Sequence, residues 1–327
     1  MSDVLKAPFP WFGGKSRAAS IIWDRFGDVP NYVEPFAGSL AVLLGRPHEA
    51  RTETVNDLDC YLANFWRAVK ADPRAVAQYA DQPVNEADLS ARHAWLVARK
   101  EVFAEHMQAE PRFYEAETAG WWVWGACCWI GSGWCSGEGP WVSDGMRLVN
   151  VKDAHVGDAG VGVNRQLPHV GDAGNQQAND QENNDLYAWM NALCRRLRRV
   201  RVCCGDWTRV TGESVTTKHG MTAILLDPPY ADTAKRTSNV YAEDSATVAH
   251  DVRQWAIANG DNPLLRIALC GYESEHAMPS SWECVAWKSS GGYGSQANKL
   301  GRANSSRERI WFSPACLKPE TQGTFTL

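Results

Sequence analysis

The chain carries an apolar run at 223–226, Ala-Ile-Leu-Leu, that leads directly into Asp227, Pro228, Pro229 and Tyr230. An apolar run of this length is typical of a buried parallel strand. A carboxylate directly after such a strand lies at the edge where open α/β sheets bind ligands. The prolines fix φ and remove backbone donors, and the tyrosine adds a flat ring. Together these groups suit the holding of an amino group on a planar ring, with a plain proline turn as the alternative.

Strand and helix patterns alternate along most of the chain. Strands are predicted at 32–34, 54–57, 200–204, 223–226, 265–270 and 308–312, and helices at 16–26, 58–70, 185–197 and 247–258. A further helix opens at 41–44, and Ser16 is the expected cap of the first helix. This alternation predicts an α/β protein with a parallel, doubly wound, Rossmann-like sheet.

A segment of different composition interrupts this alternation between residues 72 and 185. It begins with a polar helical pattern, continues with six tryptophans between 121 and 141, and then becomes Gly-rich. We therefore predict a catalytic domain in two parts, 1–71 and 186–327, with a helical, loop-rich insertion at 72–185. The tryptophans fit a small core of the insertion better than a platform for stacking bases.

The composition is that of a globular protein. The 327 residues are 44% hydrophobic and 22% charged, and the formal net charge is −5. No apolar run approaches the ~20 residues of a membrane span, and the first ten residues lack the pattern of a signal peptide. We expect a cytoplasmic protein that does not bind a membrane. The ten scattered cysteines contain no Cys-x-x-Cys, so no metal site is expected and the thiols should be reduced.

A second polar turn follows the strand at 32–34. The turn consists of Glu34, Pro35, Phe36, Ala37, Gly38 and Ser39. Its one glycine lets the backbone pass close to a ligand, but a turn with a single glycine is a poor fit for binding a pyrophosphate. Asp57 ends the next strand, about 20 residues on, where a carboxylate can accept hydrogen bonds from ribose hydroxyls. Asp206 and Trp207 follow another strand and could hold an adenine ring. Each element alone also fits an ordinary βα turn, and their order is what favours a cofactor site.

Five short blocks resemble the Dam-type DNA adenine methyltransferases, including the phage-encoded and restriction-associated members. The blocks follow one another between residue 9 and residue 230: Phe-Pro-Trp-Phe-Gly-Gly-Lys at 9–15, Glu-Pro-Phe-Ala-Gly-Ser at 34–39, Asn-Asp at 56–57, Gly-Asp-Trp at 205–207 and Asp-Pro-Pro-Tyr at 227–230. The resemblance extends from residue 8 to about residue 313 but is specific only in these blocks. The aromatic run at 121–124 lacks the Asn-Arg pair that follows it in Dam-like members, so the recognition sequence stays open.

The resemblance implies a methyltransferase fold and activity. The cofactor would be S-adenosyl-L-methionine, held by Trp11, Lys15, the turn at 34–39, Asp57, and Asp206 with Trp207. The methyl group would go to the exocyclic amino group of an adenine flipped out of double-stranded DNA, held by residues 227–230. The insertion at 72–185 would recognise the target. We expect a monomer, and a cognate restriction nuclease is left open as a partner.

Basic and aromatic residues in two loops are the candidates for DNA contacts. Lys235, Arg236 and Tyr241 follow the motif at 227–230, and Arg147 and Arg165 lie in the insertion. A basic run at 195–201 is equally consistent with a solvated helix face. Three alternatives remain: methylation of the exocyclic amino group of cytosine, methylation of RNA or of a protein glutamine, and a non-catalytic DNA-binding relative.

Overall fold

The computed structural model describes most of the chain. The described residues are 5–11, 13–129, 133–136, 141–143, 148–150, 168, 186–230, 247–287 and 307–319. Among them, no helix combines the length and the apolar content that crossing a membrane requires.

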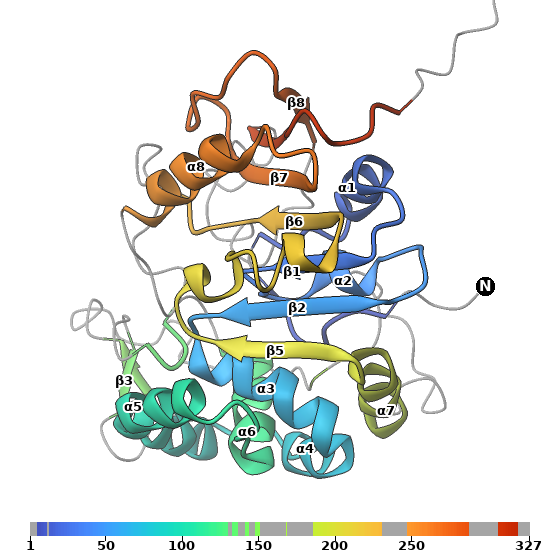
Figure 1. Cartoon of the computed structure of the whole chain (residues 1–327). Coiled ribbons are helices and arrows are strands. Elements are labelled where there is room, and N and C mark those ends of the chain that lie inside the picture. The colour runs from blue at the N-terminus through green and yellow to red at the C-terminus, as the bar shows by residue number, and fades with distance from the viewer. Residues whose placement is uncertain are drawn as a thin grey trace, which may run out of the picture.

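A seven-stranded sheet forms the centre of the molecule, with the strand order β5-β2-β1-β6-β7-β9-β8 (Figure 1). The strands are β1 (Asn31–Glu34), β2 (Thr52–Asp57), β5 (Val200–Cys204), β6 (Thr222–Leu226), β7 (Leu265–Tyr272), β8 (Glu283–Ala286) and β9 (Glu308–Phe312). A separate two-stranded antiparallel sheet pairs β3 (Trp141–Ser143) with β4 (Leu148–Asn150).

Five neighbouring strands, from β5 to β7, run parallel. β9 is antiparallel to both of its neighbours, β7 and β8. β8 was not predicted from the sequence. The prediction of a doubly wound α/β sheet is confirmed, but the expectation of a wholly parallel sheet is wrong at this edge. β8 has exposed or half-exposed residues throughout, so it lacks the apolar run by which the buried strands were found.

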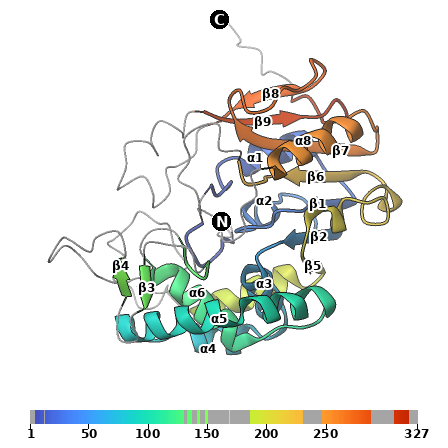
Figure 2. The ribbon, with the colours of Figure 1, turned by 90° about the vertical axis from the view of Figure 1, so that its left-hand side faces the viewer.

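The chain order reverses between β1 and β6. From β1 it proceeds outward to β2 and β5, whereas β6 leads outward in the other direction to β7. In open α/β sheets, the carboxyl ends of the strands at such a reversal flank the ligand. Figure 2 looks onto this edge, from the side toward which the parallel arrows of Figure 1 point.

Helices cover the sheet and extend beyond its β5 edge. They are α1 (Ala19–Phe26), α2 (Ala41–Leu44), α3 (Cys60–Ala71), α4 (Pro73–Ala80), α5 (Glu86–Ala109), α6 (Ala116–Cys128), α7 (Leu186–Leu197) and α8 (Val248–Asn259). Figure 1 shows α3, α4, α5 and α6 gathered below β5. α1 begins later than predicted, and Ser16 does not cap it: a turn in which Ala18 donates to the Lys15 carbonyl at 2.9 Å precedes the helix.

The main hydrophobic core continues past residue 72 without interruption. Val76, Phe103 and Trp122 belong to the same buried cluster as Val55 and Leu225 of the sheet. The tryptophans of α6 divide between two clusters, since Trp124 packs in a smaller one with Leu89 and Trp129. The first helices of the predicted insertion therefore share the core of the sheet domain, and the role of the insertion in target recognition stays a prediction.

Candidate functional site

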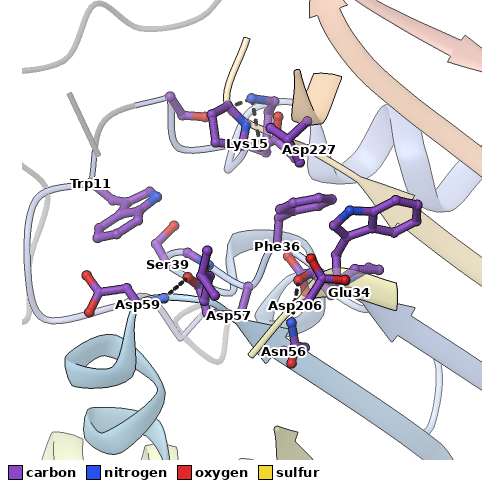
Figure 3. A pocket seen from close by; sticks show the side chains of 18 of the residues that line it. Trp11, Lys15, Glu34, Phe36, Ser39, Asn56, Asp57, Asp59, Asp206 and Asp227 are labelled. Carbon is purple, nitrogen blue, oxygen red and sulfur yellow. Dashed lines mark hydrogen bonds and ion pairs between the residues drawn. The ribbon is translucent and has the colours of Figure 1, made fainter. Parts of the chain in front are cut away.

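The turn after β1 forms one wall of a cavity at the carboxyl edge of the sheet. Gly38 has a φ of 48° and Leu40 one of 54°, which bends the chain sharply before α2. A Cβ atom on Gly38 would lie 2.6 Å from Nε1 of Trp11, so only glycine lets the indole pack here. Figure 3 shows Trp11 on one side of the pocket and Phe36 on the other.

Backbone N–H groups hold the carboxylate at the end of β2. Gly38 N donates to Asp57 Oδ2, and Asp59 N donates to Asp57 Oδ1, each at 3.0 Å. Burial raises the pKa of Asp57 to about 7, an effect that these hydrogen bonds oppose and the charge of Asp59 reinforces. The ionised form therefore becomes dominant only above neutral pH, and a ligand that donates hydrogen bonds would favour it.

The segment after β5 supplies the wall behind Phe36. Gly205 has a φ of 131° and precedes a short 3₁₀ helix, Trp207–Val210. Thr208 donates from its backbone N–H to Asp206 Oδ1 at 2.9 Å, and its hydroxyl contacts the same oxygen. The rings of Phe36 and Trp207 stack with centroids 6.3 Å apart and planes at 27°. The result is a flat aromatic wall with a carboxylate beside it.

Side chains from distant segments surround the carboxylate after β6. Lys15 Nζ lies 2.9 Å from Asp227 Oδ2 and also donates to the Gly13 carbonyl at 3.0 Å. The Tyr230 hydroxyl lies 3.3 Å from Asp227 Oδ1 and 2.9 Å from Glu308 Oε2. Lys15 is 4% exposed, whereas the Asp227 side chain is 22% exposed, so the ion pair is buried on the lysine side only. Figure 3 shows the Lys15–Asp227 pair on the side of the pocket opposite Asn56.

These walls enclose a cavity of about 290 Å³. All eleven residues predicted to bind a cofactor line it: Trp11, Lys15, Glu34, Pro35, Phe36, Ala37, Gly38, Ser39, Asp57, Asp206 and Trp207. Of the four residues predicted to be catalytic, Asp227 and Pro229 line the cavity, whereas Pro228 and Tyr230 do not. Tyr230 instead reaches Asp227 with its hydroxyl.

The cavity is strongly acidic. Its lining contains Lys15 and six carboxylates, which are Glu34, Asp57, Asp59, Asp206, Asp227 and Asp251. Burial also raises the pKa of Glu34, and the neighbouring charge of Asp227 adds to this shift. An excess of carboxylates favours a ligand that carries positive charge and hydrogen-bond donors.

Sequence reasoning gave no site role to several residues of the lining. The side chain of Asp59 caps α3 by accepting from the N–H groups of Tyr61 and Leu62. Its position two residues after Asp57 could have indicated from the sequence that it lies at the site. Asn56 donates to the Pro35 and Gly205 carbonyls at 3.1 and 2.8 Å and so ties the turns after β1 and β5 together. Three glycines of the quoted blocks, Gly13, Gly14 and Gly205, also line the cavity, and the remaining additions carry no local motif and are Ala41, Leu58, Thr247, Val248 and Asp251.

The five residues predicted to contact DNA lie outside the described part of the chain. They are Lys235, Arg236, Tyr241, Arg147 and Arg165. The basic run at 195–201 spans the end of α7 and the beginning of β5, which is the opposite end of the sheet from the cavity. Within it, Arg196 donates to both oxygens of Glu53, at 2.7 and 2.9 Å, and therefore has a structural role.

A comparison with protein families adds to this geometry. A cavity at the reversal point of a largely parallel sheet lies where open α/β proteins bind their ligands. Residues 11–118 match the family model of the D12 class N6 adenine-specific DNA methyltransferases. The match confirms the sequence-based prediction of an adenine-specific DNA methyltransferase. No curated protein matches the sequence.

The matched segment contains the first block from Trp11 onward and the whole of the second and third blocks that suggested the family. Trp11, Lys15, the turn at 34–39 and Asp57 lie within it, whereas Asp206, Trp207 and residues 227–230 lie beyond it. Asp206, Trp207, Asp227 and Pro229 nevertheless line the same cavity as the residues of the matched segment.

Proposed function

We propose that the cavity binds S-adenosyl-L-methionine and that Asp227 to Tyr230 hold the target adenine beside it, flipped out of double-stranded DNA. The observation that carries this proposal is the position of Asp227. Its carboxylate lines the cavity and also contacts the hydroxyl of Tyr230, so one side chain joins the cavity to an aromatic ring.

The residues of the cavity fit this cofactor. S-adenosyl-L-methionine carries a sulfonium and an ammonium charge, which the six carboxylates of the lining would favour. Asp57 would accept from the ribose hydroxyls, and Asp206 would accept from the amino group of the cofactor's adenine. Phe36 and Trp207 offer the aromatic wall for that ring. The volume of about 290 Å³ lies near the lower end of the range of small-molecule sites.

The protein would contribute positioning and electrostatics to the transfer. The cofactor supplies an activated methyl group, so no metal is needed for this chemistry. Asp227 and the Pro228 carbonyl would accept the two amino hydrogens of adenine, which aims the nitrogen lone pair at the cavity. Positive charge develops on that nitrogen, and the Asp227 carboxylate would stabilise it.

The aromatic ring at the end of the motif would offset the cost of base flipping. Extruding a base costs a few kcal/mol. Stacking on Tyr230 would return about 1–3 kcal/mol. Lys15 lies 5.3 Å from the centroid of this ring and 2.9 Å from Asp227, so its ammonium borders the space that the base would enter.

The setting of the enzyme is also a proposal. We propose that a cytoplasmic monomer acts on double-stranded DNA, that the segment 72–185 contacts the target, and that Lys235, Arg236, Tyr241, Arg147 and Arg165 contribute DNA contacts. A paired restriction nuclease would fit the same chemistry.

The test is the methylation pattern in a bacterial host that lacks DNA methylation. Wild type, Asp227→Ala and Asp261→Ala are expressed, and modified bases are mapped by single-molecule sequencing; Asp261 is exposed and makes the matched control. We expect methylated adenine with the wild type and the control and none with Asp227→Ala. Adenine methylation at the wild-type level by a folded Asp227→Ala variant would overturn the proposal.

A further inference from the structure

Glu308 is a buried carboxylate beside the proposed base site, and the sequence analysis gave it no role. It begins β9, lies opposite Tyr272 of β7 in the antiparallel register, and is 5% exposed. Because a buried carboxylate is costly unless its oxygens are paired, its partners indicate why it is placed there.

The partner of Glu308 at this site is the hydroxyl of Tyr230. The hydroxyl oxygen of Tyr230 lies 2.9 Å from Glu308 Oε2, whereas it lies 3.3 Å from Asp227 Oδ1. A phenol has one proton to donate, and the shorter contact directs it toward Glu308. Burial raises the pKa of Glu308, and the nearby ammonium of Lys15 opposes this shift.

A second contact holds the ring of Tyr230 itself. Tyr272 packs edge-on against it, with centroids 4.7 Å apart and planes at 77°. The same strand pair therefore supplies both supports, because Tyr272 and Glu308 are paired residues of β7 and β9. Rotating the ring would break its contact with Tyr272, and moving the hydroxyl would break its bond to Glu308.

We infer that Glu308 is a positioning residue for Tyr230, an inference that rests on the proposed stacking of the target adenine against that ring. Glu308 accepts the phenol proton, which fixes the plane of the ring. It also keeps that proton away from Asp227, whose oxygens are needed for the amino group of adenine. Glu308 does not line the cofactor cavity, and its hydrogen bond at this site is to the hydroxyl of Tyr230.

A double-mutant cycle tests this inference. Glu308→Ala, Tyr230→Phe and the double variant are compared for kcat and KM with unmethylated bacterial DNA, using radiolabelled S-adenosyl-L-methionine as methyl donor. Glu308→Ala should lower kcat/KM for DNA about tenfold, the value of one hydrogen bond to a charged group. In the Tyr230→Phe background, the same substitution should change kcat/KM less than about threefold, because the hydroxyl is already absent.

Two further variants separate positioning from folding. Glu308→Gln keeps an acceptor oxygen and the side-chain volume, so it should retain activity within about threefold of wild type. Glu273→Ala removes a neighbouring carboxylate that pairs with Arg309 at 2.8 Å, and it should leave kcat/KM unchanged. Cofactor affinity, measured by calorimetry, should be the same in all of these variants.

Equal losses from Glu308→Ala in the two backgrounds would overturn the inference, as would a Gln variant as impaired as the Ala variant. If Glu308→Ala does not fold, Glu308→Gln and Glu308→Leu complete the cycle, because both keep the volume of the side chain. Failure of the proposed function can be distinguished from failure of this inference, because Asp227→Ala would then methylate DNA normally. If Asp227→Ala is inactive but the effects of Glu308→Ala and Tyr230→Phe on kcat/KM are additive, the proposed function stands and only the role of Glu308 is overturned.

Discussion

The carboxylates after β2 and β5 are held differently from the carboxylate after β6. Asp57 and Asp206 accept hydrogen bonds from backbone N–H groups of Gly38, Asp59 and Thr208. Asp227 instead contacts the side chains of Lys15 and Tyr230. A backbone donor is placed by the turn that carries it, whereas a side-chain partner must be brought from another part of the chain.

This difference has a functional consequence. The Asp57 and Asp206 sites should tolerate most changes of neighbouring side chains, because the backbone donors remain. The Asp227 site should be sensitive to them, because each substitution removes a charge or a proton from the network. Three substitutions probe this contrast, beginning with the one expected to have the largest effect.

The first substitution removes the cation beside Asp227. Lys15→Met keeps much of the side-chain volume but leaves the half-buried carboxylate of Asp227 without its ammonium partner, close to Glu34 and Glu308. Breaking one side of a buried pair costs about 3–5 kcal/mol. We expect methyl transfer to fall at least about a hundredfold. The measurement is turnover with radiolabelled cofactor, and Lys6→Met, in a residue outside the cavity, is the control. Turnover within threefold of wild type would contradict the network.

The second substitution addresses the carboxylate with the raised pKa. The affinity of wild type for S-adenosyl-L-methionine should increase as the pH rises from 6 to 8, because the pKa of Asp57 is about 7 and its ionised form is the stronger acceptor for the ribose hydroxyls. Asp57→Asn should bind about tenfold more weakly at pH 8 and show a flatter pH profile. Calorimetry at pH 6, 7 and 8 measures both. Parallel profiles for the two proteins would show that another group titrates.

The third substitution should have the smallest effect. Thr208→Val removes the hydroxyl that contacts Asp206 Oδ1 but leaves the backbone N–H bond of 2.9 Å in place. We expect cofactor affinity to fall about twofold to threefold, the lower end of the range for one hydrogen bond. A tenfold loss would mean that side chains, and not the backbone, hold this carboxylate as well. Thermal unfolding provides the control for a change in stability.

Local pattern was enough to predict the elements that carry the cavity. β1, β2, β5 and β6 each have a carboxylate at the carboxyl end or within two residues after it, and the structure forms these strands within two residues of the predicted bounds. The eleven predicted cofactor residues lie on the turns after these strands or in the segment before α1, and they share one cavity. Their roles stay predictions, but their convergence follows from the rule that parallel strands end at the same edge.

Local pattern could not predict contacts that depend on strand order. Glu308 resembles any charged residue at the start of a strand, and it reaches Tyr230 only because β9 pairs with β7 in one register. Thr247, Val248 and Asp251 likewise enter the cavity through the placement of α8. Neither set has a motif in the sequence.

The sequence by itself determined the α/β alternation, the polar ends of the strands and the blocks that indicate an adenine methyltransferase, because these depend on residues close together in the chain. The tertiary structure alone decided the antiparallel edge, the pairing of Lys15 with Asp227 and the contact between Glu308 and Tyr230. The physical reason is that a side-chain network forms only where segments distant in sequence meet, and their meeting depends on the order and register of the whole sheet.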